Sequence, residues 1–246
     1  MAADDTSSKP ANPYVIELTS PFTDDDDRAM RAYYDQRAAE YDEWYLRRGL
    51  FAMREDRERW DAELRALAER VRGFGAGRLL EIACGTGWWT RHLACRARVV
   101  ALDYSAAMLG VTRERLRAAG LAARLIRADA YALPLPPNSF DSCFIGCWMS
   151  HVPYVRLPDF LAGVRKVLTR SAAVMVIDTA PPPGENRPEP GAEYYNPRKL
   201  NDGSHHRVLK IDHNTATLAS ALAPLGRVVE TWNTGRHFVG AVIEVV

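Results

Sequence analysis

The feature that most constrains the fold is the stretch from Leu79 to Thr90, where an apolar run ends in two closely spaced glycines. The run has the length of a strand, and a helical pattern begins directly after the glycines. Gly85 and Gly87 carry no Cβ, so the backbone can approach a ligand closely, and the start of the helix supplies unpaired N–H groups. The stretch therefore predicts a strand, a tight turn and a helix that together face a ligand.

The residues that follow this turn favour a nucleoside as the ligand. A second apolar strand ends at Asp103, where a carboxylate can accept hydrogen bonds from both hydroxyls of a ribose. The dinucleotide fingerprint G-x-G-x-x-G is incomplete, because Thr90 stands in place of its third glycine. A third strand ends at Asp129–Ala130, and a fourth begins at Phe140–Asp141. The third and fourth motifs favour a site for a different nucleoside ligand over a dinucleotide site.

Together the motifs resemble the class I S-adenosylmethionine-dependent methyltransferases, and especially the branch of ubiquinone, menaquinone and natural-product methyltransferases. The resemblance covers about residues 79–179, with weaker similarity toward both ends. It implies an α/β fold, a Rossmann-like doubly wound sheet of seven mostly parallel strands with the last strand antiparallel, and an N-terminal helical cap. It also implies S-adenosylmethionine as cofactor, S-adenosylhomocysteine as product, and no metal.

The chain is predicted to have three parts: a flexible segment over 1–23, a helical cap over 24–73, and a methyltransferase core over 74–246. The Pro-rich run 180–191 cannot form a helix or a central strand. Because it follows a strand, we expect a lid insertion near 180–207, although a loop without a role explains the run equally well.

Helical and strand patterns fill these parts. Four aspartates after Thr23 suit the first turn of a helix, aromatic residues recur at helical spacing over 28–48, and Ser105 suits an N-cap. Further helices are predicted near 56–72, 88–96, 105–119, 157–168 and 215–225. Strands are predicted near 78–84, 98–103, 123–128, 142–147, 172–179, 208–211, 227–232 and 238–245.

The resemblance assigns cofactor contacts to motif positions. They are Glu81, Gly85 and Gly87 for the methionine and sulfonium region, Asp103 for the ribose, and Asp129 with the Ala130 N–H for adenine. Trp88 and Thr90 are expected near the methionine part, Tyr34 and Tyr41 over it from the cap, and Cys147 between cofactor and substrate. Plain packing of an amphipathic helix explains the two tyrosines equally well.

Methyl transfer is an in-line displacement that depends on positioning, so catalytic residues are less determined than cofactor residues. His151 follows the fourth strand, and an unperturbed pKa near 6.5 suits a general base. It could instead cap a helix or bond a backbone carbonyl. The predicted substrate contacts are Tyr33, Tyr45, Trp148, Asp178, His205 and His206, around a small, aromatic or apolar acceptor.

Composition limits the function further. A net charge of +1 and a pI near 7.7 give no reason to expect binding to nucleic acid. No apolar run is long enough to span a membrane. The four cysteines form no C-x-x-C motif, which fits a reduced, cytoplasmic protein. We expect a monomer or a homodimer. We expect methylation of a small molecule of secondary metabolism, at oxygen in preference to nitrogen or carbon. The alternatives are a nucleic-acid methyltransferase and a non-catalytic partner subunit.

Overall fold

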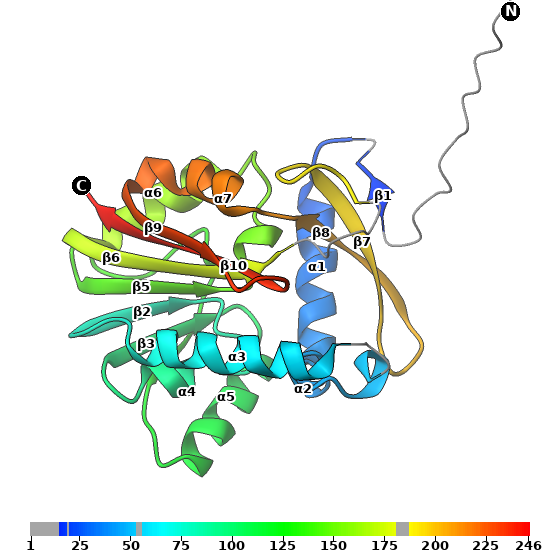
Figure 1. Ribbon diagram of the computed structural model, residues 1–246, viewed down its shortest axis with the longest axis horizontal. Helices are drawn as coiled ribbons and strands as arrows, with labels where there is room; N and C mark the ends of the chain where they lie inside the picture. The colour runs from blue at the N-terminus through cyan, green and yellow to red at the C-terminus, as the bar shows by residue number, and fades with distance from the viewer. Residues whose placement is uncertain (1–14, 19, 53–55, 181–186) are drawn as a thin grey trace, which may run out of the picture.

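The computed structural model describes residues 15–18, 20–52, 56–180 and 187–246. Figure 1 shows a main sheet between two layers of helices, with a smaller sheet and the helix α1 (Asp24–Gln36) at one end. Most of the predicted flexible segment and part of the predicted lid, residues 1–14, 19 and 181–186, lie outside the described residues. Within the described ranges, no helix is long and apolar enough to cross a membrane.

The main sheet has seven strands. In spatial order they are β4 (Arg124–Arg127), β3 (Arg98–Asp103), β2 (Arg78–Ile82), β5 (Phe140–Gly146), β6 (Leu168–Thr179), β10 (Phe238–Val245) and β9 (Gly226–Asn233). The five strands from β4 to β6 are parallel, and β10 is antiparallel to both of its neighbours. This arrangement confirms the predicted doubly wound sheet with an antiparallel last strand.

Helices cover both faces of this sheet because its strands are apolar on both sides. Leu79 faces a core that includes Trp60, whereas its neighbour Leu80 faces a second core that includes Phe160. The first core is covered by α3 (Arg57–Arg72), α4 (Thr90–Leu93) and α5 (Ala106–Ala118), and the second by α6 (Leu157–Val167) and α7 (Thr215–Leu222). Four 3-10 helices are also present in the described ranges: η1 (Arg37–Ala39), η2 (Gly49–Phe51), η3 (Met149–His151) and η4 (Ala223–Leu225).

Two helix starts follow the sequence expectation. The Thr23 hydroxyl accepts a hydrogen bond from the Asp26 N–H (3.3 Å), and four aspartates occupy the first turn of α1. Ser105 caps α5, since its hydroxyl accepts from the Met108 N–H (3.1 Å). The helix predicted near 88–96 is shorter, because α4 is a single turn. The His92 N–H bonds the carbonyl three residues earlier, that of Trp89, as in a 3-10 turn.

The helical region expected over 28–48 is interrupted. α1 ends at Gln36, η1 follows, and only the short α2 (Glu43–Leu46) resumes the helix before Arg47, which is left-handed (φ 49°). Asp42 explains the break, since it pairs with Arg115 and accepts a hydrogen bond from the Thr86 hydroxyl (2.7 Å). These tertiary contacts hold the connection between α1 and α2 against the main domain.

A second sheet was not predicted as such. It has the order β1 (Ile16–Glu17), β7 (Glu193–Lys199) and β8 (His205–Ile211), all antiparallel, and it packs against α1 (Figure 1). The range expected to be a lid thus includes β7 and the start of β8. Pro197 obscured β7 in the sequence, but among the described residues β1 pairs only with Tyr194 and Tyr195 and does not reach Pro197.

Candidate functional site

A first cavity lies at the carboxyl ends of the parallel strands, beneath α1. The turns after β2, β3, β4 and β5 form one wall, and α1 contributes Asp27, Met30, Arg31 and Tyr34 to the other. The lining includes seven of the predicted cofactor residues: Tyr34, Tyr41, Gly85, Asp103, Asp129, Ala130 and Cys147. The sequence motifs therefore converge on one cavity.

The two glycines of the turn after β2 have different roles. Gly85 has a left-handed backbone (φ 55°), and a Cβ there would meet no atom within 4 Å, so this turn leaves open space for a ligand. Gly87 is also left-handed (φ 73°), but its Cβ would lie 2.7 Å from the Thr112 side chain. The Gly87 position is thus fixed by packing against α5, whereas Gly85 borders the cavity.

Asp103 ends β3 and is held by two backbone groups. Its Oδ2 accepts from the Gly85 N–H (2.8 Å), and its Oδ1 accepts from the Ser105 N–H (2.9 Å). Burial raises the pKa of this carboxyl, although the backbone N–H groups act in the opposite direction. Each carboxylate oxygen has a second acceptor site, so Asp103 can still bind two hydroxyls from the cavity.

Asp129 connects the turn after β4 to the cap. Its Oδ1 accepts from the Tyr131 N–H (2.9 Å), and its Oδ2 accepts from Arg31 of α1 (2.9 Å). Arg31 also pairs with Asp27 (2.7 Å) and stacks over the Tyr104 ring at 4.2 Å. These contacts hold α1 across the first cavity.

Four predicted cofactor residues lie outside the described lining of this cavity: Glu81, Gly87, Trp88 and Thr90. Glu81 is 1% exposed, and burial raises its pKa to about 8. Its Oε2 is buried and has no hydrogen-bond partner among the described residues. Trp88 stacks in parallel on Tyr45, with ring centroids 4.3 Å apart. These four residues therefore do not line the first cavity.

A second cavity lies between the cap, the end of β6 and the second sheet. Its lining includes aromatic residues of the cap together with Asp178, Arg198 and Lys210. Four residues line both cavities, and we call them the junction: Tyr34, Tyr41, Cys147 and His151. Two ligands, one in each cavity, would therefore meet at these side chains.

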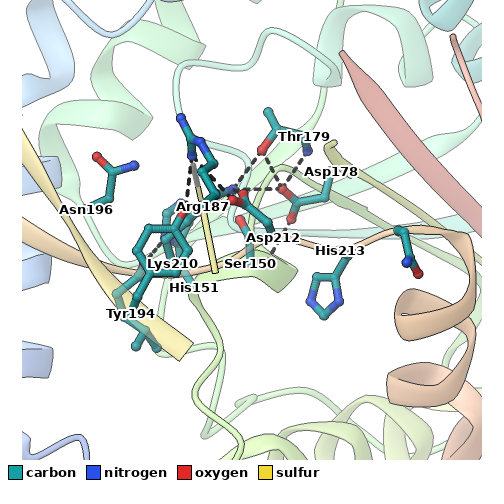
Figure 2. A network of polar contacts seen from close by, with 12 residues as sticks. Ser150, His151, Asp178, Thr179, Arg187, Tyr194, Asn196, Lys210, Asp212 and His213 are labelled. Atoms are coloured by element: carbon teal, nitrogen blue, oxygen red, sulfur yellow. Dashed lines mark hydrogen bonds and ion pairs between the residues drawn. The ribbon is translucent and has the colours of Figure 1, made fainter. Parts of the chain in front are cut away.

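Buried charged residues line one side of the second cavity (Figure 2). Lys210 of β8 lies 3.5 Å from Asp178 and 4.0 Å from Asp212, and it donates to the Thr179 hydroxyl (2.7 Å). Asp178 also accepts from the Ser150 N–H (2.9 Å). Burial alone would raise the pKa of Asp178, but the charge of Lys210 and this hydrogen bond hold it below its ordinary value.

His151 lies at the junction in a fixed orientation. Its Nδ1 is 2.6 Å from the Leu209 carbonyl oxygen, so Nδ1 carries the proton and donates it. Its Nε2 therefore accepts from the Tyr34 hydroxyl, 2.9 Å away. Burial, followed by the charge of Lys210, lowers the pKa of His151, which keeps the ring neutral at neutral pH. Burial raises the pKa of Cys147 to about 12, so its thiol keeps its proton.

The structure separates the predicted substrate residues. Trp148 lines the first cavity and Asp178 the second. Tyr33 and Tyr45 are buried outside both linings, and His206 contacts the Tyr33 ring rather than a cavity. His205 is exposed at the start of β8. Among the described residues, no cluster of three His, Cys, Asp or Glu side chains could hold a metal ion.

Sequence reasoning missed the basic residues of the second cavity. Arg37, Arg198 and Lys210 come from η1, β7 and β8, which only the fold brings together. No motif carries them, and arginine is abundant throughout the chain. The sequence offered one signal for an anion-binding cavity: Arg198 lies in the predicted lid, and Lys210 lies in the strand predicted directly after it.

Known proteins resemble both the core and the whole fold. Residues 79–171 match the family model described as "Methyltransferase domain". A demethylmenaquinone methyltransferase of Thermus thermophilus is 32% identical over 109 residues, 43% of this chain and 49% of its own length. A ubiquinone/menaquinone biosynthesis C-methyltransferase of Dinoroseobacter shibae is 38% identical over 131 residues, half of each chain. The chain thus spans about half the length of the curated relatives it matches.

Solved structures match more of the chain. The structure titled "DhpI-SAM-HEP complex" superposes with a TM-score of 0.72 and 28% identity, covering 90% of this chain and 98% of that one. The core of the chain thus matches a methyltransferase domain in sequence, and its fold resembles that of class I S-adenosylmethionine-dependent methyltransferases. The first cavity lies at the strand ends where the sequence motifs converge.

Proposed function

We propose that this protein transfers a methyl group from S-adenosylmethionine to a small molecule. The observation that carries the proposal is the pair of cavities that meet at the junction of Tyr34, Tyr41, Cys147 and His151. One cavity presents the predicted nucleoside-binding residues, and the other has space for an acceptor. In-line displacement needs this arrangement, because donor and acceptor must approach from opposite sides of the transferred carbon.

The first cavity suits S-adenosylmethionine. We place the ribose hydroxyls on Asp103 and the adenine near Asp129 and Ala130, which leaves the sulfonium end near Gly85 and the junction. The match to a solved structure of a SAM complex supports this cofactor. Residues 24–73, together with the second sheet, then act as a cap over both ligands.

We favour oxygen as the methylated atom, with nitrogen and carbon as alternatives. His151 is the predicted general base, but a neutral imidazole with a lowered pKa binds a proton weakly, and its Nε2 already accepts from Tyr34. These contacts favour a positioning role, in which His151 holds Tyr34 at the junction. A general base would instead have to exchange that hydrogen bond for one to the acceptor.

A pair of His151 variants separates the two roles. If His151 positions Tyr34, then His151→Gln, which can still accept a hydrogen bond, should keep at least about a tenth of the wild-type kcat, and His151→Ala should lose more. The wild-type kcat should show no rise centred near pH 6.5, since the pKa of His151 is lowered. Losses above about 100-fold in both variants would indicate general-base catalysis instead.

A labelling experiment tests the proposed function itself. The protein is incubated with S-adenosylmethionine radiolabelled in its methyl group and with separate small-molecule, nucleic-acid and protein fractions of the source organism. We expect label in the small-molecule fraction, together with S-adenosylhomocysteine. Label in nucleic acid would favour the alternative of a nucleic-acid methyltransferase. Absence of label from every fraction, despite cofactor binding, would favour the non-catalytic partner subunit.

A further inference from the structure

The second cavity carries more positive than negative charge in its described lining. Five basic side chains face two carboxylates, although the whole chain has a net charge of only +1. The histidines of the lining, His151 and His237, are neutral, since burial lowers the pKa of each. The charged residues are Arg37, Arg47, Arg187, Arg198 and Lys210, with Asp178 and Asp212 as the carboxylates.

Both carboxylates already have basic partners, Lys210 and Arg187, in the cavity lining. Asp178 pairs with Lys210 (3.5 Å), and Asp212 pairs with Arg187 (3.3 Å) and lies 4.0 Å from Lys210 (Figure 2). Asp212 also accepts from the Tyr194 hydroxyl (2.7 Å). The two carboxylates of the described lining are therefore held within this network, and neither forms an ion pair with Arg37 or Arg198.

Arg37 is a buried cation of this kind. It is 8% exposed, and its guanidinium lies over the Tyr41 ring at 4.7 Å from the centroid. Among the described residues, no carboxylate lies within the 4.0 Å of an ion pair with Arg37. Stacking on an aromatic ring offsets only part of the cost of removing a cation from water. The neighbouring tyrosines hold the pKa of Arg37 above its ordinary value despite burial, so the guanidinium stays charged and can bind an anionic ligand.

Arg198 of β7 provides a second donor in the same cavity. Its Nη1 donates to the Asn196 amide oxygen (2.9 Å), while its Nε is buried and has no hydrogen-bond partner within the described ranges. The charges of Arg37 and Arg198 both act on the pKa of Tyr34, whose hydroxyl bonds His151 at the junction. Arg37 and Arg198 line the same cavity as Tyr34 and His151, so both face the space from which an acceptor would meet the cofactor.

We propose that the methyl acceptor carries an anionic oxygen group, a carboxylate or a phosphoryl group, bound by Arg37 and Arg198. Guanidinium groups suit such anions because they offer planar, paired N–H donors. Aromatic rings of the same lining, including Trp44 and Trp60, suit an apolar remainder of the molecule. This inference rests on the proposed function and adds a charged group to the aromatic or apolar acceptor predicted from the sequence.

Binding of matched probes tests the charge requirement. The protein is saturated with S-adenosylhomocysteine and titrated calorimetrically with phenylphosphonate, benzoate and benzyl alcohol, which share one ring and differ in the charged group. We expect at least one anion to bind at least 10-fold more tightly than benzyl alcohol, and the preferred anion identifies the group. Equal binding of benzyl alcohol, or failure of both anions to bind, would overturn the proposal.

Arginine variants test the assigned residues. Arg37→Gln and Arg198→Gln should each weaken binding of the preferred anion by about 10- to 100-fold, the value of a charge-assisted hydrogen bond. Binding of S-adenosylhomocysteine should be unchanged, since neither residue lines the first cavity. Arg207→Gln is the matched control, because Arg207 is exposed on β8 and pairs with Asp26. If Arg37→Gln does not fold, Arg198→Gln decides alone, and unchanged anion binding in it would contradict the assignment.

A fractionated extract distinguishes this inference from the proposed function. The small-molecule fraction is divided on an anion-exchange resin, and each part is incubated with the protein and labelled S-adenosylmethionine. Label should enter only the retained, anionic part. Label in the unretained part would overturn the anionic acceptor and leave methyl transfer intact. If neither part accepts label, the proposed function fails as well.

Discussion

Asp103→Ala should weaken binding of S-adenosylhomocysteine at least about 100-fold. The side chain supplies two acceptors for the ribose hydroxyls, and hydrogen bonds to a charged group contribute about 1.5–3 kcal/mol each. It also accepts from the Gly85 and Ser105 N–H groups, so its loss loosens the turn that borders the cavity. Calorimetric titration of the wild type and the variant measures the change.

Two further variants make this result specific. Asp103→Asn keeps an acceptor and should lose less affinity than Asp103→Ala. Asp141→Ala removes a carboxylate that also accepts a backbone N–H, that of Arg78 (2.9 Å), but at the other end of the sheet. Its affinity for S-adenosylhomocysteine should stay within about twofold of the wild type. Equal affinity in Asp103→Ala and the wild type would remove Asp103 from the cofactor site.

Asp178→Ala should destabilise the fold by about 3–5 kcal/mol at pH 7. Asp178 is fully buried, accepts from the Ser150 N–H and pairs with Lys210, which is itself buried. Removing one partner of a buried ion pair leaves the other charge uncompensated, and this costs several kcal/mol. Urea unfolding at equilibrium measures the difference in the free energy of unfolding.

The pH dependence of this difference provides a second check. The pKa of Asp178 in the folded protein is below its ordinary value of 3.8. Its stabilising contribution is therefore complete above about pH 4 and is lost as the pH falls through the folded pKa. The wild type and Asp178→Ala should converge in acid. Asp159→Ala, which removes an exposed carboxylate from α6, should cost no more than about 1 kcal/mol; an equal cost for both variants would contradict the buried pair.

The sequence predicted the main sheet because its signals are local. The strand, turn and helix start around Gly85 depend on neighbouring residues, as do the Ser105 cap and the acids after Thr23. The strand patterns are confirmed for the same reason, whereas the antiparallel last strand, also confirmed, was implied by the family resemblance. Seven predicted cofactor residues, including Asp103 and Asp129, line one cavity, although their contacts with a cofactor stay predictions.

The cap and the second cavity depend on contacts between residues far apart in the sequence, so local patterns did not predict them. The break between α1 and α2 results from Asp42, whose partners Thr86 and Arg115 lie far along the chain. β7 was obscured by Pro197, a residue that is rare in the middle of a sheet. Arg37 and Arg198 are brought together by the packing of the cap on the second sheet, which no local pattern records.

A crystal structure of the protein with bound S-adenosylhomocysteine tests the central claim most directly. We predict that the ribose hydroxyls lie within hydrogen-bond distance of Asp103 and that the sulfur faces the second cavity at the junction, beside Tyr34 and His151. The claim would be contradicted if the molecule bound outside the first cavity, or if its sulfur faced away from the second.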